Sequence, residues 1–154
     1  MKDRRKELAD LSGGHPNDRR HVWYSLGGPD LDPAEITEAT GIAPDRAWKA
    51  GDAKPRTSLP YKECVWLIDS GHRQADEFHD HLDALLARMR PSWAAFVALG
   101  QRYEADVEAA IYCMEAQCPL VIVVPEVSAS VSELNASLGF DLYALAESDE
   151  SPIS

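Results

Sequence analysis

The stretch that decides the fold runs from residue 21 to residue 41 and reads HVWYSLGGPDLDPAEITEATG. Within its first six residues every second side chain is apolar, which is the pattern of a strand with one buried face. The glycines and proline that follow end the strand. Asp32 is a suitable N-cap, Pro33 fits the first helical position, and Gly41 supplies a left-handed stop. These signals predict a strand that is followed by a short helix, from Pro33 to the residue before Gly41.

The remaining elements follow from the same two periodicities. Apolar residues at helical spacing predict a long helix over 75–89 that ends at Pro91, and a second helix over 92–99. A third helix is expected between Pro125 and Gly139. The predicted strands are 21–26, 46–51, 63–69, 106–114, 119–124 and 140–144. This order implies an α+β fold, with a largely antiparallel sheet of five to six strands and three to four helices packed on it.

Two of these strands are apolar on both faces. Residues 63–69 carry large apolar side chains at alternate and at intervening positions, and residues 120–124 read LVIVV. Strands of this composition are typical of positions inside a sheet or covered on both faces. We therefore expect both strands to lie within the sheet.

The chain has 154 residues, a length that suits one domain with one hydrophobic core. Residues 1–20 combine charge with glycine and proline and offer little to bury, so we predict a mobile N-terminal arm. Residues 21–145 form the predicted domain, and residues 146–154 an acidic C-terminal tail.

Composition narrows the class of protein. The formal net charge is −11, which disfavours a protein that binds the phosphates of nucleic acids. The longest strongly apolar stretch, 118–125, is too short to span a membrane as a helix, and the basic N-terminus does not lead into a signal sequence. Three cysteines without such a signal indicate reduced thiols, so we expect a cytoplasmic protein.

Charge is distributed unevenly along the chain. Residues 103–154 contain ten acidic residues and no lysine or arginine. One interpretation is solubility, which net charge alone supplies. The other is an acidic surface that attracts a basic partner.

No catalytic or cofactor motif is present. Asp76, His79, Asp80 and Asp83 share one face of the predicted helix over 75–89, but that face lies opposite the apolar stripe and is expected to be solvated. The phosphate-binding, dinucleotide-binding, zinc-protease and nucleophile-elbow patterns are all missing. We predict no cofactor, no metal site and no catalytic residue, although Ser–His or Cys–His pairs formed by the fold remain open.

Two groups of residues are candidates for ligand binding. Around residue 48 a tryptophan lies among basic residues on a loop, an arrangement that suits an acidic or planar ligand. Near the C-terminus Asp141 and Tyr143 share one face of the last predicted strand, where they could bind a hydroxyl or exchange a proton. Structural roles are the alternative in each case. The full candidate set is Arg46, Trp48, Lys49, Asp52, Trp66, Asp141 and Tyr143.

Several short motifs resemble one bacterial family. They are Trp23–Leu26 with Asp32–Thr37, Trp48–Asp52, Trp66, His81–Leu86 leading to Arg90 and Pro91, and Gly139–Tyr143. Together they make residues 21–145 similar to the family catalogued as domain of unknown function number 4279. The resemblance implies a small cytosolic protein and carries no activity or catalytic residues with it.

Three functional hypotheses follow. The first is a non-enzymatic binding protein whose acidic surface engages a basic protein partner, in an immunity- or antitoxin-like role. The second is a small-molecule-binding protein or minor enzyme with a pocket near Arg46, Trp48, Lys49, Asp141 and Tyr143. The third is self-association through Trp23 or an edge strand. Whether the chain is an enzyme is not decided by the sequence, and the missing motifs favour a binding protein.

Overall fold

A computed structural model describes residues 15–146 of the chain. The elements in chain order are β1 (Arg19–Gly28), α2 (Pro33–Thr40), β2 (Arg46–Trp48), β3 (Cys64–Asp69), α3 (Phe78–Met89), η1 (Arg90–Ser92), α4 (Trp93–Arg102), β4 (Glu104–Cys113), η2 (Met114–Ala116), α5 (Pro125–Glu133) and β5 (Ala136–Ala144). The strands form one sheet in the order β2-β3-β1-β4-β5. None of the helices in residues 15–146 has the length and apolar composition that crossing a membrane requires.

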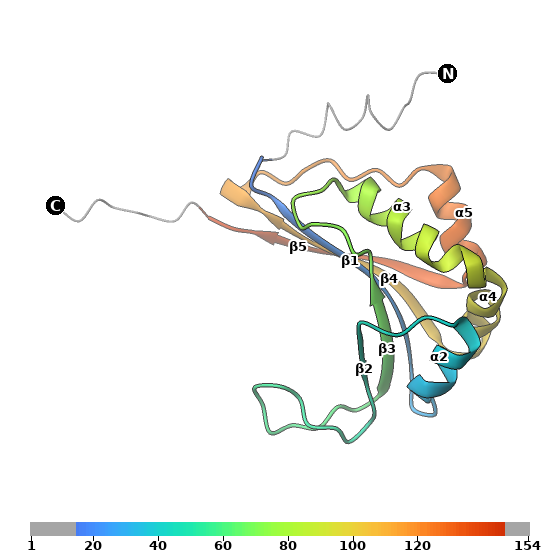
Figure 1. The fold of residues 1–154 in the computed structure, drawn as a ribbon. Coiled ribbons are helices and arrows are strands. Elements are labelled where there is room, and N and C mark those ends of the chain that lie inside the picture. The colour runs from blue at the N-terminus through green and yellow to red at the C-terminus, as the bar shows by residue number, and fades with distance from the viewer. Residues whose placement is uncertain (1–14, 147–154) are drawn as a thin grey trace.

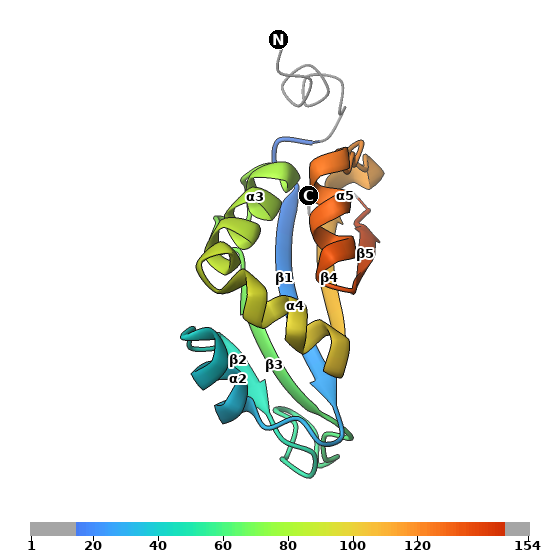
Figure 2. The same cartoon turned by 90° about the vertical axis from the view of Figure 1, so that its right-hand side faces the viewer.

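The helices in residues 15–146 all lie on one side of this sheet, and none of them covers the other side (Figures 1 and 2). The inward side chains of β1, β3 and β4 and the apolar faces of the helices form one continuous core. Phe96 of α4 lies at its centre, edge-on to Tyr24 with ring centroids 5.4 Å apart and tilted against Trp66 at 6.0 Å. Burial of such large rings is the main stabilising contribution to a domain of this size.

The predicted α+β class is confirmed, but the sheet is mixed. Three neighbouring pairs, β2–β3, β3–β1 and β1–β4, are antiparallel, whereas β5 runs parallel to β4. The strand predicted over 63–69 lies inside the sheet, between β2 and β1, as its two apolar faces indicate.

Helix α2 is confirmed at both ends. The carboxylate of Asp32 accepts a hydrogen bond from the backbone N–H of Ala34 at 3.0 Å, and Gly41 adopts the left-handed conformation with φ of 69°. Leu31 and Ile36 are both buried on either side of the cap. Local signals were sufficient here because the cap and the stop act within one turn of the helix.

The prediction of a strand over 119–124 is wrong. Residues 117–124 form an irregular connection that runs back along the helix side of the sheet to α5 (Figure 1). Both edges of β4 are already paired, with β1 and with β5, so no position in the sheet is open beside it. Val121, Val123 and Val124 are apolar because they pack against the core.

The helix after Pro125 is shorter than predicted. It ends at Glu133, and Asn135 takes a left-handed conformation with φ of 53° that turns the chain into β5. Gly139, which was expected to end the helix, therefore lies inside β5. Leu138 continues the helical spacing of the preceding valines by coincidence, since it faces the core from a strand.

Helix α3 begins at Phe78 rather than at residue 75. The residues before the helix are held against the sheet instead. The backbone N–H of Arg20 in β1 donates to the carbonyl of Gln74 at 2.8 Å. Arg20 is itself buried, and its guanidinium donates to the carbonyl of Asp76 at 3.4 Å.

Other boundaries differ by a few residues. Strand β2 stops at Trp48 instead of residue 51, where the chain turns, whereas β4 begins two residues earlier than predicted. The predicted arm over 1–20 is described only from residue 15, and β1 already begins at Arg19. The predicted tail over 146–154 lies outside the described residues except for Ala146.

Gly100 provides a test of the packing between α4 and the turn before β5. A Cβ at this position would lie 2.0 Å from the carbonyl oxygen of Leu134, so Gly100→Ala should lower the free energy of unfolding by more than about 2 kcal/mol. In an unconstrained helix the same change stabilises by about 1 kcal/mol. Urea denaturation measures the difference. Gly27→Ala is the control, because its Cβ meets nothing closer than 3.9 Å. An unchanged or higher midpoint for Gly100→Ala contradicts the close approach.

Candidate functional site

The sheet face that lacks helices among residues 15–146 is called here the open face. Its side chains come from alternate positions of all the strands, in agreement with the strand register. Trp23 and Ser25 of β1 are half-buried at its centre, and Leu67 of β3 is buried by its neighbours.

Four carboxylates cross this face on adjacent strands. Glu104, Asp106 and Glu108 alternate along β4, and Asp141 of β5 lies diagonally beside Glu108. We call these four residues the acidic row. Positions two apart on a strand are separated by about 7 Å, so the row is a nearly continuous line of negative charge. The alternation is visible in the sequence as EADVE and was the signal that could have placed these residues on one face.

Within the described residues, the acidic row has no cation paired with it. No lysine or arginine among residues 15–146 forms an ion pair with any of its members. Partial burial and the neighbouring Glu104 raise the pKa of Asp106, although a hydrogen bond from Ser137 lowers it. Partial burial, Asp106 and Asp141 raise the pKa of Glu108. In the folded protein, burial and the neighbouring negative charges therefore both disfavour ionisation of Asp106 and Glu108.

The basic loop over 49–63 lies at the opposite edge of the sheet. Its side chains contact one another and neighbouring residues. Trp48 stacks on Tyr61 with ring centroids 4.6 Å apart, and Lys54 lies 5.6 Å from the centre of the Tyr61 ring. The carboxylate of Asp52 accepts from the backbone N–H of Lys49, and the Lys49 ammonium lies 3.8 Å from Asp32. These contacts favour the structural interpretation of Trp48 and Lys49.

The predicted ligand-binding residues do not converge. Arg46 and Trp48 lie on β2, whereas Asp141 and Tyr143 lie on β5, at the other edge of the sheet. Four strand spacings of about 4.8 Å separate the two edges by about 19 Å. Trp66 faces the helices, is completely buried and donates from Nε1 to the hydroxyl of Thr37 at 3.1 Å, so it does not reach a ligand.

Asp141 and Tyr143 form the contact that their spacing suggests. The Tyr143 hydroxyl donates to the Asp141 carboxylate at 3.2 Å, and Tyr143 stacks on Tyr112 with ring centroids 4.8 Å apart. The hydrogen bond to Asp141 raises the pKa of Tyr143. Both side chains are exposed at the sheet edge, where a phenol with a raised pKa is a poor proton donor at neutral pH.

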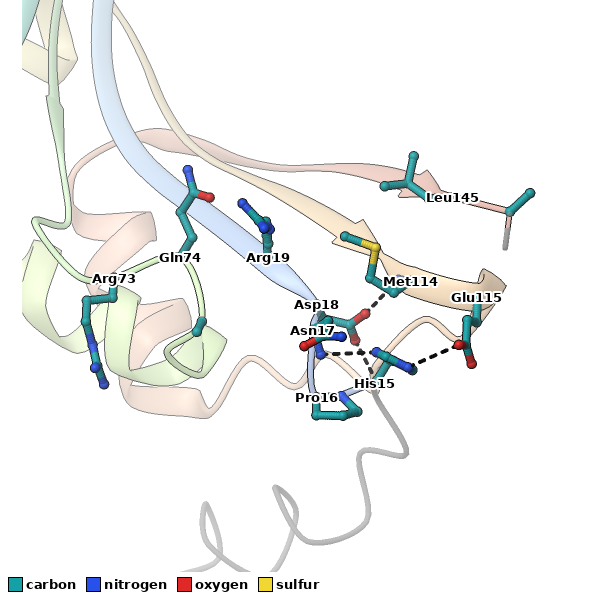
Figure 3. Close-up of a pocket in the computed structure, with 12 residues that line it drawn as sticks. His15, Pro16, Asn17, Asp18, Arg19, Arg73, Gln74, Met114, Glu115 and Leu145 are labelled. Carbon is teal, nitrogen blue, oxygen red and sulfur yellow. Dashed lines mark hydrogen bonds and ion pairs between the residues drawn. The ribbon is translucent and has the colours of Figure 1, made fainter. Parts of the chain in front are cut away.

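An open cavity of about 960 Å³ lies where β1 begins and β4 ends (Figure 3). The buried carboxylate of Asp18 accepts from the backbone N–H groups of His15 and Met114, at 2.9 and 2.7 Å. The His15 ring accepts from the N–H of Asn17 and lies 3.4 Å from Glu115. These polar groups are satisfied by one another and connect the two strand ends.

The fold also creates one Ser–His contact that no local motif indicates. The Ser70 hydroxyl lies 2.6 Å from Nδ1 of His81, and both residues are buried. Burial, His72 and Arg20 lower the pKa of His81, although Asp76 and a hydrogen bond involving Arg73 oppose the shift. Without access for a substrate this pair fits a role in fixing α3 to the sheet. In residues 15–146 no three His, Cys, Asp or Glu side chains are placed to share a metal ion.

Residues 15–146 form an α+β fold in which the described helices cover one side of a mixed sheet. Residues 18–145 match the family described as Domain of unknown function (DUF4279), and the chain belongs to this family. No curated protein and no solved structure shows a significant match to the chain.

Glu108 tests the repulsion within the acidic row. A raised pKa means that the folded state keeps a proton that the unfolded chain releases, so stability is lost as pH rises through the interval between the two pKa values. Glu108→Gln should therefore raise the free energy of unfolding at pH 7, by less than about 1 kcal/mol because the group is partly solvated. The gain should fade as the pH falls below about 4.3, where glutamate is protonated in either state.

Urea denaturation at several pH values measures this difference. Glu38→Gln, an exposed change in α2, controls for the loss of one negative charge. Equal gains in the two variants, or a gain that does not depend on pH, would show that the row is not under strain.

Proposed function

We propose that this protein is a non-enzymatic binding protein whose acidic row engages a basic macromolecular partner, in an immunity- or antitoxin-like role. The observation that carries the proposal is a line of four carboxylates on one accessible sheet face, without a paired cation among the described residues. A partner that brings lysines or arginines to this line relieves the repulsion and gains charge-assisted hydrogen bonds.

The electrostatics of the row support a protein partner over a nucleic acid. Phosphates would be repelled by Glu104, Asp106 and Glu108, which alternate along β4 on the open face. Guanidinium and ammonium groups are attracted, and the half-buried Trp23, whose backbone position pairs with Glu108, offers a ring face on which a cation can stack.

Placement of the other candidates supports a binding role over catalysis. The Tyr143–Asp141 pair is open to solvent, and the Ser70–His81 pair is buried. A pocket that unites Arg46 and Trp48 with Asp141 and Tyr143 would have to span the width of the sheet. The second hypothesis from the sequence therefore has no geometric support.

A cationic probe tests the proposal. An oligolysine peptide of about eight residues, long enough to span the row, should bind the wild-type protein with an affinity that falls as salt rises. The variant Glu104→Gln, Asp106→Asn, Glu108→Gln, Asp141→Asn should bind at least about tenfold more weakly. Isothermal titration calorimetry measures the affinities, and backbone NMR shifts should move on β4 and β5.

The matched control removes the same charge elsewhere. Glu35→Gln, Glu38→Gln, Asp80→Asn, Glu126→Gln neutralises four carboxylates on α2, α3 and α5. Its affinity should fall by less than about threefold, because only the long-range charge changes. If both variants lose affinity equally, net charge rather than the open face determines binding and the proposal fails.

A further inference from the structure

The two edges of the sheet differ in how they are protected. Strand β2 is three residues long and carries Arg46, features that discourage pairing with another chain. Strand β5 is nine residues long, contains no lysine, arginine or proline, and pairs with β4 in an unbroken register without a bulge. Among the described residues no strand occupies its outer edge (Figure 2).

Apolar exposure is concentrated at this same edge. Phe140 is 41% exposed and Leu142 56% exposed, although both point toward the helix side of the sheet. Tyr143 and Leu145 are exposed to a similar degree. An unprotected strand edge beside large exposed apolar side chains is the combination that other chains pair with.

We propose that two copies of this chain pair edge to edge through β5, in an antiparallel register centred on Phe140, so that their sheets become continuous. This inference goes beyond the proposed function and uses the edge of the sheet rather than the acidic row.

The sequence of β5 is self-complementary in this register. Phe140 then faces Phe140 of the second copy, Leu142 faces Leu138, and Tyr143 faces Ser137. All nine residues pair, because Phe140 is the midpoint of the strand. A shift by one residue would set Phe140 against Asp141, since the two faces of a strand alternate. The full register instead keeps apolar side chains against apolar ones.

The size of the contact suits a weak, specific dimer. Nine residues at about 3.4 Å each give a seam about 30 Å long. With side chains on both faces the seam is about 20 Å deep, so each copy buries on the order of 600 Å². This area lies at the lower end of the range for specific interfaces, and we expect a dissociation constant on the order of 10 μM.

Electrostatics oppose the dimer and give it a characteristic salt dependence. In the proposed register Asp141 faces Gly139, so the two Asp141 carboxylates are diagonal neighbours about 7 Å apart. Each chain carries a net charge of −11. Added salt screens this repulsion and should tighten the dimer, whereas it weakens the binding of a cationic partner.

Sedimentation velocity of the full chain tests self-association. The wild-type protein should shift from monomer to dimer between about 1 and 100 μM, and the shift should move to lower concentration at higher salt. Leu142→Glu should remain monomeric at concentrations at least about tenfold higher, because it sets a carboxylate against Leu138. Leu59→Glu, the same change at a residue 64% exposed outside the sheet, should dimerise like the wild type.

Cysteine cross-linking tests the register. In a Cys118→Ser background, which removes the exposed native thiol, Phe140→Cys should form a disulfide-linked dimer under mild oxidation. Leu142→Cys should not, because the two copies of residue 142 lie about 14 Å apart in this register. Leu59→Cys measures the rate of random collision, and Phe140→Cys should exceed it at least about tenfold.

The outcomes separate the two proposals. A chain that stays monomeric at 100 μM and high salt, or a Phe140→Cys rate no higher than that of Leu59→Cys, overturns the dimer and leaves oligolysine binding untouched. Faster cross-linking of Leu142→Cys overturns the register.

Discussion

The packing of the described helices against one face of the sheet is the constraint on which the rest of the structure depends. Because α3, α4 and α5 pack on the inner face, each central strand must be apolar on that side, whereas its outer side can carry polar residues. Strand β4 meets this requirement with Ala105, Val107, Ala109 and Ile111 on the inside and Glu104, Asp106 and Glu108 on the outside. The acidic row is thus positioned by the alternation that builds the core.

Local signals in the sequence predicted the elements whose ends are determined within a few residues. Helix α2 has its cap, its first-turn proline and its left-handed stop in one continuous stretch. The prediction of a strand over 119–124 was wrong because its outcome depends on pairing with distant parts of the chain. The valines of this segment are apolar because they cover the core. Only the strand order shows that this segment cannot pair with β4, since β1 and β5 already occupy both edges of that strand. Apolar composition reports burial and does not distinguish a strand from a packed connection.

The candidate site could be predicted only in part, because some of its contacts follow from local alternation and others depend on the strand order. The charge asymmetry of residues 103–154 is visible in the sequence, and the contact between Asp141 and Tyr143 follows from strand alternation alone. The distance between Asp141 and Arg46 depends on the order of the strands in the sheet. That order is determined by pairing between distant segments, so no short stretch of sequence predicts it. The Ser70–His81 contact joins α3 to the residue that follows β3, and it likewise has no local signal.

The open face and the β5 edge are linked by their charges. The proposed register places the helix layers of both copies on the same side, so the two open faces form one surface that carries two acidic rows. Repulsion between the Asp141 carboxylates then opposes dimerisation, and a cationic partner that bridges the rows removes this repulsion. Because coupling between binding events is reciprocal, a partner that strengthens the dimer is also bound more tightly by the dimer than by the monomer. Among residues 15–146, an edge strand with exposed apolar side chains lies beside an acidic row without paired cations, as expected of a chain whose self-association depends on its partner.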